Sequence, residues 1–319
     1  MRISVAMCTY NASRFLREQL DSIAFQTRPI EELVICDDGS QDNTAEIIRN
    51  FSLNTSLHVR FIQNGQNLGT ARNFEKSISM CKGELIALCD QDDVWFPEKL
   101  EKLAGILEGD HTLGGAFSDA ELIDEQSQPL GRRLWAGVHY ANLDSPHCHA
   151  EGPLARTLLK YEVVTGATLM IRAALRDQVL PIPPPWIHDG WIAWMLVLHS
   201  GIAATPDPLV KYRIHHAQQV GIGSNRVLER LHQAREVGRK QHALTVARRF
   251  EAIRAHWVQN PPSRCSISLD DIDAKIQLSH LRVNLSSNYL IRIPEVGRAA
   301  HLYLKYSRGI PIMCRDLLV

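Results

Sequence analysis

The sequence has no long run of apolar residues. Its longest run, WIAWMLVL from Trp191, has eight residues, whereas an α-helix needs about 20 to cross a bilayer. The sequence therefore predicts no membrane span. The amino-terminal segment MRISVAMCTYNASRF reaches a polar turn by residue 9 and has no apolar core of a signal peptide. We expect a cytoplasmic protein.

Paired cysteines are also missing. The chain has seven cysteines, an odd number, and no CxxC pair. Cys36 and Cys89 lie within apolar strand patterns, where a free thiol behaves as a small hydrophobic side chain. This usage favours a reduced, cytosolic compartment over a disulfide-stabilised scaffold.

Three common phosphate-binding motifs are absent or misplaced. The segment CTYNASRF after the first expected strand contains no glycine, so the GxGxxG motif of dinucleotide-binding folds is missing. No GxxxxGK followed by Ser or Thr occurs, which excludes a P-loop. A haloacid-dehalogenase-type phosphatase would carry its DxD after the first strand, but here it follows the fourth. A site that holds a diphosphate through a metal ion remains.

The composition is that of a globular protein with an uneven distribution of charge. The 319 residues are 45% hydrophobic and 22% charged, enough for one large or two modest domains. Residues 1–224 carry 19 Lys and Arg against 27 Asp and Glu, and residues 225–319 carry 16 against 8. The basic part suits either peripheral contact with an anionic membrane face or a packed helical cap with solvated charges.

Short strand patterns alternate with helical ones in the first 120 residues. The expected strands are Ile3–Cys8, Leu33–Cys36, Val59–Gln63 and Leu85–Cys89, each followed by a helical segment. This order predicts an α/β fold with a doubly wound, mainly parallel sheet. Later, TGATLMIRAAL and DPLVKYRI are typical of strands and HDGWIAWMLVLHSG of an apolar helix. We expect a catalytic domain over 1–224 and a helical region over 225–319, interrupted by the loop NPPSRCSIS.

Acidic residues follow two of these strands. The segment LVICDDGSQD contains Asp37 and Asp38, and LIALCDQDDVWFPEKL contains three carboxylates from Asp90 to Asp93. Carboxylates so close raise one another's pKa unless a cation neutralises them. One interpretation is a solvated turn that caps the helix near Pro97; the other is a site for Mg²⁺ or Mn²⁺, which prefer oxygen ligands. In parallel sheets ligands bind beyond the carboxyl ends of the strands, where both clusters lie.

At this point the sequence resembles a known family. The segments VAMCTYN, ICDDGSQDNT, NLGTARNFEKS and CDQDDVWFPEKL are similar, in order, to the motifs of family 2 inverting glycosyltransferases with the GT-A fold. The resemblance covers roughly residues 1–221. IHDGWIAW and YRIHHAQQVG, and more weakly YLKYSRGIPIMCRDLL, resemble the bacterial rhamnosyltransferase-like branch.

The resemblance implies roles for eleven residues. Donor binding falls to Thr9, Asn11, Asp38, Asn67, Gly69, Arg72 and Asp90, metal binding to Asp92 and His215, and the catalytic base to Asp189, with His188 orienting it. Asp189 could also simply cap the helix that it opens, and Asn67, Gly69 and Arg72 could serve ordinary helix capping. The family usually continues HxxN, but Gln218 replaces that asparagine, and the adjacent His216 leaves open which imidazole points inward.

Further side chains fit more than one interpretation. His147–His149 form an HCH triplet whose spacing is typical of a polar loop rather than of a metal site, and Asp93 suits a helix cap better than a ligand. Among Trp186, Trp191 and Trp194, which could form a sugar platform, helical spacing places at least one in the core.

The implied activity is transfer of one sugar, rhamnose or another deoxyhexose, from a nucleoside diphosphate sugar to a saccharide or lipid-linked saccharide acceptor in bacterial surface polysaccharide synthesis. The chain lacks the QxxRW motif of processive members, and no nucleic acid partner is expected. A catalytically inactive nucleotide-sugar-binding module and a sugar nucleotidyltransferase remain alternatives. The second would need a Gly-rich basic loop after the first strand, for which CTYNASRF is a poor match.

Overall fold

The computed structural model describes residues 1–137, 147–148, 154–216, 236–262 and 265–318. The chain divides into two compact units. Unit 1 comprises Met1–Gly152, Val163–Ile182 and Trp186–Gly223, and unit 2 comprises Pro153–Glu162, Pro183–Pro185 and Ser224–Val319. None of the helices within the described residues is both long and apolar enough to cross a membrane.

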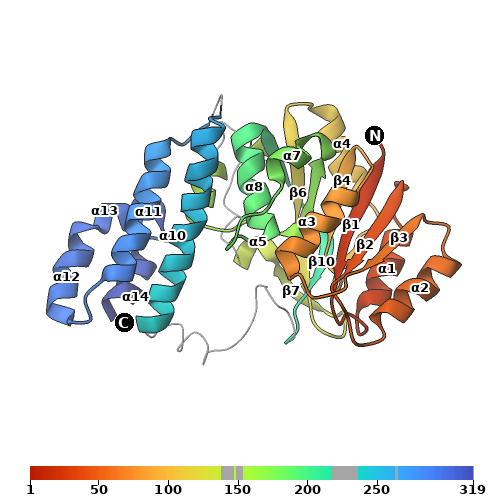
Figure 1. Cartoon of the computed structure of the whole chain (residues 1–319), viewed down its shortest axis with the longest axis horizontal. Helices are drawn as coiled ribbons and strands as arrows, with labels where there is room; N and C mark the ends of the chain where they lie inside the picture. Colours follow the sequence, from red (N-terminus) through yellow and green to blue (C-terminus); the bar gives the residue numbers. More distant parts are fainter. Residues whose placement is uncertain (138–146, 149–153, 217–235, 263–264, 319) are drawn as a thin grey trace. The chain divides into compact units, whose positions relative to one another are not determined.

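Unit 1 is built on one sheet with the strand order β3-β2-β1-β4-β9-β6-β10-β5, with β7 paired to β6 and β8 to β10 (Figure 1). The strands are β1 (Ile3–Thr9), β2 (Glu32–Asp37), β3 (Val59–Gln63), β4 (Leu85–Cys89), β5 (Val94–Trp95), β6 (Leu113–Ile123), β7 (Pro129–Arg133), β8 (His147–Cys148), β9 (Leu169–Arg172) and β10 (Gly201–Arg213). The first four are mutually parallel, as are β6 and β10.

The helices of unit 1 connect these strands. They are α1 (Leu16–Ala24), α2 (Thr44–Asn54), α3 (Thr70–Met80), α4 (Lys99–Gly109), α5 (Leu134–Gly137), α7 (Arg176–Val179) and α8 (His188–His199), with the short 3₁₀ turns η1 (Gly166–Thr168) and η2 (Ala173–Leu175). The helix α3 packs on β1 and β2 and also contacts α8. Every residue of β1, β2 and β4 is buried, which explains their nearly continuous apolar sequences.

The prediction of an α/β fold with a mainly parallel, doubly wound sheet is confirmed for β3-β2-β1-β4. The sheet then continues with β9, which runs antiparallel to both β4 and β6. Two local expectations need correction. The segment TGATLMIRAAL forms a strand only over Leu169–Arg172, flanked by η1 and η2. The long strand β6 was not predicted at all, although it lies between β9 and β10 in the sheet.

Unit 2 is helical, as predicted for the carboxyl-terminal region. Its helices are α6 (Leu154–Leu158), α10 (Glu236–Gln259), α11 (Leu269–Asn284), α12 (Tyr289–Arg298), α13 (Ala300–Tyr306) and α14 (Ile310–Leu318). A buried ionic cluster joins three of them. Asp316 accepts hydrogen bonds from Arg282 (2.5 Å) and from the hydroxyl of Tyr303 (2.8 Å). Because both ends of the ion pair are buried, it stabilises the packing only as long as it stays intact.

Candidate functional site

The carboxyl ends of β1, β2 and β4 meet at one edge of the sheet, because β1 lies between the other two and all three are parallel. The hydroxyl of Thr9 donates to Oδ1 of Asp37 (2.8 Å), and the backbone amide of Asp38 donates to the carbonyl of Thr9 (2.8 Å). Oδ1 of Asn11 accepts from the backbone amide of Gln41 (2.9 Å). These bonds join the turns after β1 and β2 into one surface.

Asp38 organises the loop before α3. Its Oδ1 accepts from the Asn64 side chain (2.9 Å) and the Leu68 amide (2.8 Å), and its Oδ2 accepts from the Gly69 amide (2.9 Å). The amide group of Asn67 donates to the carbonyl of Asp38 (3.3 Å). Gly69 has a φ of +80°, which disfavours side chains at this position. The structure thus brings Asp38, Asn67 and Gly69 together, and their contact with a donor stays a prediction.

The second acidic cluster follows β4. Burial, together with the negative charges of Asp92 and Asp189, raises the pKa of Asp90 to about 7. Nε2 of His215, which follows the end of β10, lies 2.7 Å from Oδ2 of Asp92. Two predicted metal ligands, separated by more than 120 residues in the sequence, therefore face each other. His216 is exposed, so His215 is the imidazole that points inward. Gln218 lies outside the described residues.

Asp93 has a framework role in place of the predicted helix cap. Its carboxyl is buried, and Oδ1 accepts from the backbone amide of Arg213 (2.9 Å), whereas the residue at the amino-terminal cap of α4 is Glu98. Burial and the charges of Asp92 and Asp90 raise the pKa of Asp93 well above its usual range.

A buried amine, which was not predicted, lies near this cluster. Burial lowers the pKa of Lys99 to about 7, and the nearby Cys89, Asp93 and Asp90 oppose this shift. Its ammonium donates to the carbonyl of Ala167 (2.6 Å).

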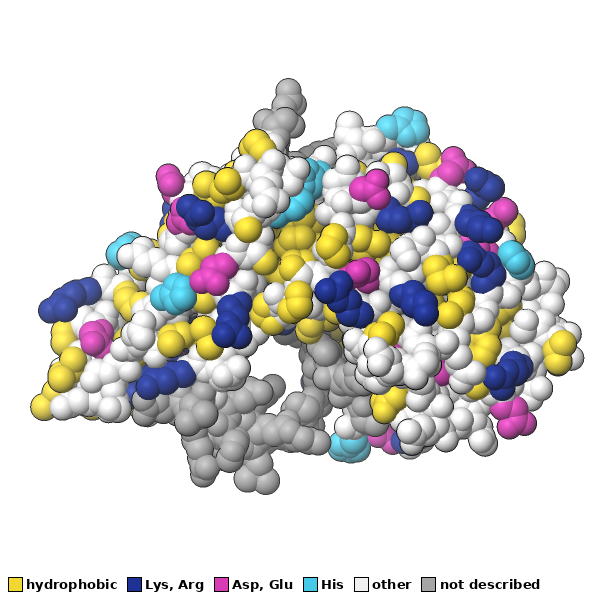
Figure 2. All heavy atoms as spheres, in the orientation of Figure 1, with side chains coloured by type: hydrophobic (Ala, Val, Ile, Leu, Met, Phe, Trp, Pro, Cys, Tyr) yellow, Lys and Arg dark blue, Asp and Glu magenta, His cyan; other side chains and the backbone are white. Residues whose placement is uncertain are grey.

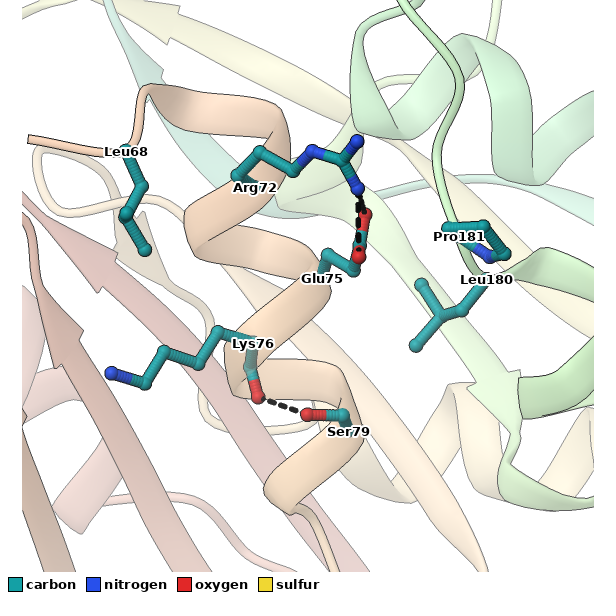
Figure 3. Close-up of a pocket in the computed structure, with 7 residues that line it drawn as sticks. All are labelled: Leu68, Arg72, Glu75, Lys76, Ser79, Leu180 and Pro181. Atoms are coloured by element: carbon teal, nitrogen blue, oxygen red, sulfur yellow. Dashed lines mark hydrogen bonds and ion pairs between the residues drawn. The ribbon is translucent and has the colours of Figure 1, made fainter.

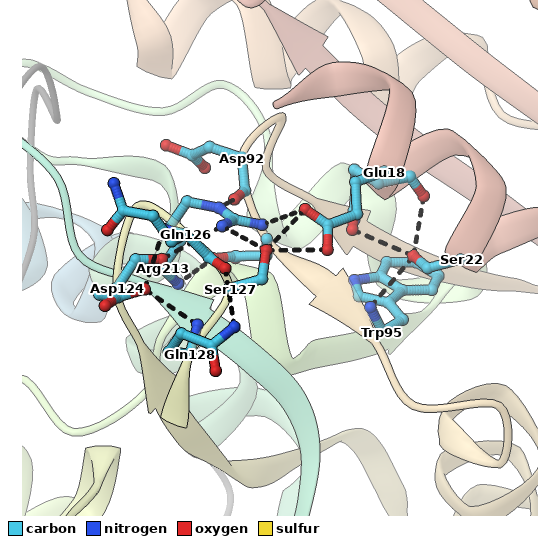
Figure 4. Close-up of polar contacts among 11 residues, drawn as sticks. Glu18, Ser22, Asp92, Trp95, Asp124, Gln126, Ser127, Gln128 and Arg213 are labelled. Carbon is cyan, nitrogen blue, oxygen red and sulfur yellow. Dashed lines mark hydrogen bonds and ion pairs between the residues drawn. The ribbon is translucent and has the colours of Figure 1, made fainter. Parts of the chain in front are cut away.

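Arg213 ties the acidic loop to three other parts of unit 1 (Figure 4). Its fully buried guanidinium donates to the carbonyl of Asp92 (2.7 Å), the carboxylate of Glu18 (2.6 Å), the hydroxyl of Ser127 (2.8 Å) and the carbonyl of Asp124 (3.2 Å). Sequence reasoning assigned no role to this arginine. An arginine at the end of a strand pattern that contains apolar residues is the signal that could have identified it, because a buried guanidinium must be paired.

Asp189 lies in the first turn of α8, at a distance from Asp90 that lets its charge raise the Asp90 pKa. The residue at the amino-terminal cap of α8 is Ile187, so Asp189 is not the cap itself. Its Oδ2 accepts from the backbone amide of Gly166 (3.3 Å). The adjacent His188 stacks on Phe74, with ring centroids 3.7 Å apart, and neither of its ring nitrogens has a hydrogen-bond partner in the described ranges. The structure thus brings the predicted base to the acidic cluster.

Whether these residues fit a divalent cation depends on their charge and donor atoms. Within the described residues, no group of three or more His, Cys, Asp or Glu side chains converges as a ready-made metal site. The pair of Asp92 and His215 supplies one oxygen and one nitrogen donor. Burial, together with the charges of Asp92 and Asp189, raises the pKa of Asp90, and a nearby cation would favour its ionised form. Mg²⁺ typically binds one or two carboxylates and completes its shell with substrate phosphates and water. The residues fit that mode of binding.

Arg72 lies apart from the contacts described so far. It forms an ion pair with Glu75 (2.7 Å) and lines an open pocket of about 630 Å³. Figure 3 shows its guanidinium directed at Glu75 and toward the chain segment opposite α3. The lining residues are Leu68, Arg72, Glu75, Lys76, Ser79, Leu180 and Pro181. No hydrogen bond between described residues joins Arg72 to Asp38 or Asp90, so its donor contact stays a prediction.

Two further expectations concern aromatic and histidine side chains. Trp186, Trp191 and Trp194 are all buried, which fits the core interpretation for all three and leaves no exposed sugar platform among them. His147 and Cys148 form the short strand β8, paired antiparallel to β10; the expected loop is therefore a strand at these two positions. His149 lies outside the described residues.

Solved structures with a similar fold are glycosyltransferases of the GT-A class. The structure of S. aureus TarS, residues 1–349, in complex with UDP-GlcNAc has a TM-score of 0.61, is 19% identical, and aligns over 96% of this chain and 82% of that chain. The mannosyltransferase PcManGT from Pyrobaculum calidifontis, in complex with GDP-Man and Mn²⁺, has a TM-score of 0.52 at 17% identity, over 94% of this chain and 75% of that chain. At these identities the likeness concerns the fold.

The family follows from the sequence comparison. The model of Glycosyl transferase family 2 matches residues 4–176. The chain belongs to this family, and the prediction of family 2 membership is confirmed.

Curated relatives carry glycosyltransferase names. An uncharacterized glycosyltransferase of Nostoc sp. is 27% identical over 68% of this chain and 66% of its own length. The putative glycosyltransferase EpsE of Bacillus subtilis is 32% identical over 56% of this chain and 64% of its own length. TuaG of the same organism, a putative teichuronic acid biosynthesis glycosyltransferase, is 25% identical over 66% of this chain and 79% of its own length. The match thus spans just under two thirds of the Nostoc and EpsE proteins.

Proposed function

We propose that this protein is an inverting glycosyltransferase that transfers one sugar from a nucleoside diphosphate donor to a hydroxyl group of an acceptor. The observation that carries this proposal is the convergence of Asp90, Asp92, His215 and Asp189 at one edge of the sheet. One carboxylate-imidazole pair is available to hold a cation, and a separate carboxylate is available for acid-base work. Family 2 membership supports this division of roles.

The site residues would act together in one displacement. Asp92 and His215 would hold Mg²⁺ or Mn²⁺, and a bound divalent cation would offset negative charge on the leaving diphosphate. Asp189 accepts the proton of the acceptor hydroxyl, and the oxygen of that hydroxyl bonds to the anomeric carbon at the same time. The bond between that carbon and the diphosphate breaks in the same step, and the configuration inverts. Thr9, Asn11, Asp38 and Asp90 would contact the nucleoside.

The finer assignments extend the same proposal. Rhamnose or another deoxyhexose as the donor sugar rests on the resemblance of IHDGWIAW and YRIHHAQQVG to one bacterial branch. A saccharide or lipid-linked saccharide acceptor in surface polysaccharide synthesis is supported by the name of TuaG. TarS and PcManGT have been captured with UDP-GlcNAc and GDP-Man, respectively, which supports a nucleotide-sugar donor. A cytoplasmic location completes the proposal.

The test is a donor screen followed by one substitution. The protein with Mn²⁺ is incubated with a panel of nucleotide sugars and candidate saccharide acceptors, and the released diphosphate is measured. In Asp189→Asn we expect transfer to fall by at least about a hundredfold, the range for a lost general base, with donor affinity and melting temperature retained. The matched control is Asp177→Asn, which changes an exposed first-turn aspartate of α7 and should leave transfer unchanged.

Two outcomes would contradict the proposal. Near-normal transfer by Asp189→Asn would remove Asp189 as the base. Calorimetry that detects donor binding, without release of diphosphate from any donor, would identify an inactive nucleotide-sugar-binding module.

A further inference from the structure

The helix α12 of unit 2 exposes four large apolar side chains and buries one of its two arginines. Tyr289, Leu290, Ile291 and Ile293 are exposed by 51%, 78%, 52% and 42%, whereas Arg292 is only 5% exposed. Two of the buried guanidinium nitrogens of Arg292, Nε and Nη1, have no hydrogen-bond partner among the described residues. A surface helix normally has the opposite arrangement, with apolar side chains toward the core. This helix is therefore suited to a second apolar environment outside the protein.

The neighbouring helices α13 and α14, which pack against each other and against α12, extend this surface. Leu304 on α13 and Ile310 and Leu318 on α14 are exposed by 53%, 60% and 80%. Among the described residues, thirteen large hydrophobic side chains are exposed, and seven of them lie between residues 289 and 318. We call the exposed side chains of α12, α13 and α14 the α12–α14 surface. Figure 2 shows hydrophobic side chains beside Lys and Arg where Figure 1 labels α12.

The charges on the α12–α14 surface are positive. Arg298 and Arg308 are exposed. Lys305 is also exposed, but it forms an ion pair with Asp271 of α11 (3.1 Å). The two acidic residues of this segment are partly or fully buried: Asp316 is fully buried, and Glu295 is half-buried and accepts from the backbone amide of Ser286 (3.0 Å).

Buried nitrogens without partners add to this pattern. Within the part of the chain that the structure describes, Nε of Arg315 on α14 is buried without a hydrogen-bond partner, as are the two nitrogens of Arg292 on α12. Buried donors without partners are rare in folded proteins. These buried guanidinium groups add to the positive charge of this part of unit 2. An occupant that brings anionic groups to the exposed arginines and apolar bulk to the exposed hydrophobic side chains would match both features of the surface.

Of the available occupants, an anionic bilayer fits best. A second copy related by a twofold axis would bring the same positive charges face to face, which opposes association. An anionic leaflet offers phosphate oxygens to the basic side chains and acyl chains to the apolar ones, the combination by which amphipathic helices bind at membrane interfaces. We infer that the α12–α14 surface docks on anionic membranes, with Leu290, Ile291 and Ile293 entering the acyl boundary.

The expected effects follow from side-chain chemistry. Each exposed basic side chain should contribute roughly fivefold to binding of an anionic leaflet, and each apolar side chain that enters the acyl boundary roughly tenfold. Binding of vesicles does not depend on sugar transfer, so this inference does not rest on the proposed function and can fail without it.

The experiment is co-sedimentation of the full chain with vesicles. Vesicles of phosphatidylcholine with about 30% phosphatidylglycerol should bind the protein at low salt, with binding falling as salt screens the charges, and pure phosphatidylcholine should bind it far less. Leu290→Ser with Ile291→Ser should weaken binding by at least about tenfold. Arg298→Gln with Arg308→Gln should weaken it and flatten its salt dependence. All four side chains are exposed, so these variants should keep the melting temperature of the wild type.

Matched controls separate the surface from general stickiness. Phe25→Ser with Leu53→Ser removes two equally exposed apolar side chains of unit 1 (76% and 83%), and Arg132→Gln with Arg248→Gln removes two exposed arginines elsewhere; both pairs should bind like the wild type. Three results would overturn the inference: no vesicle binding at low salt, equal losses in the control variants, or a dimer that Leu290→Ser with Ile291→Ser converts to a monomer. The last result would assign the surface to a second copy.

Discussion

Gly166 lies so close to His188 that a single methyl group should disturb the candidate base. A Cβ added at Gly166 would lie 2.3 Å from Nε2 of His188, well inside van der Waals contact. The imidazole cannot easily retreat, because it is 4% exposed and its ring stacks on Phe74 at 3.7 Å. The amide of Gly166 also donates to Oδ2 of Asp189. A shift of the Gly166 backbone or of His188 should therefore also displace the side chain of Asp189.

The expected magnitude of Gly166→Ala combines two effects. Overpacking of a filled core typically costs about 1–3 kcal/mol, and the lower entropy of the unfolded chain offsets roughly 0.4–1 kcal/mol of this when glycine is replaced by alanine. We expect a net loss of about 1–2 kcal/mol in the free energy of unfolding. Displacement of a catalytic group by about 1 Å can cost a hundredfold in rate, so transfer should fall much more than stability does.

The assay is a double-mutant cycle with urea unfolding and transfer measured on the same samples. In the His188→Ala background the added methyl has space, so Gly166→Ala should cost almost nothing there. Gly105→Ala is the matched control, because a Cβ at Gly105 in α4 meets nothing within 4 Å; it should be neutral or slightly stabilising. An equal loss of stability from Gly166→Ala in both backgrounds, or unchanged transfer in the single variant, would refute the reasoning.

Two further predictions concern the metal and the acid stability of unit 2. Asp92→Ala should unfold like the wild type but lose Mn²⁺-dependent donor binding in calorimetry, whereas Asp177→Ala should not; unchanged affinity would remove Asp92 as a ligand. Burial raises the pKa of Asp271, but hydrogen bonds from the Ser268 backbone and from Lys305 and Tyr306 outweigh this and lower it to about 2. The ionised carboxylate of Asp271 should therefore stabilise the folded state by about 2 kcal/mol. This stabilisation should be fully present above the pKa of the group in the unfolded chain, near 4, and should be lost as the pH falls toward 2. The stability gap between wild type and Asp271→Asn in urea unfolding should therefore close on acidification; a constant gap would contradict the assignment.

Local patterns were sufficient for the first half of the sheet. The strands Val59–Gln63 and Leu85–Cys89 lie where the apolar patterns predict them, because each is a short buried run between turn residues. The strand β6 escaped prediction since its sequence, LGGAFSDAELI, starts with two glycines and contains acidic residues, which weaken strand propensity. Close packing explains glycine at this position, because a Cβ at Gly115 would lie 2.6 Å from the side chain of Leu196 in α8. A contact between segments so far apart cannot be read from local sequence.

For the candidate site too, some residues could be predicted from local motifs and others could not. The motif resemblance selected Asp92 and His215, which are 123 positions apart in the sequence, and the fold places their side chains 2.7 Å apart. The supporting residues were missed because their roles depend on long-range contacts: Arg213 meets Glu18 across 195 positions, and Lys99 meets the carbonyl of Ala167 across 68. The sequence around Arg213 does not indicate that Glu18 is its partner, and the sequence around Lys99 does not indicate Ala167.

The side chains from Asp90 to Asp93 have different roles, which explains why so many acidic residues lie in one short segment. Gln91 joins the turn after β1, since its Oε1 accepts from the amide of Tyr10 (2.7 Å) and its Nε2 donates to the carbonyl of Tyr10 (3.2 Å). Asp93 points into the core and accepts from the amide of Arg213. Residues 91 and 93 thus hold the loop, while the carboxyl of Asp90 accepts no hydrogen bond from the described residues and Asp92 meets His215. Because the alternate residues 91 and 93 hold the loop, the carboxyl groups of Asp90 and Asp92 are not needed for that purpose, which supports the proposal that they contact the donor and the metal.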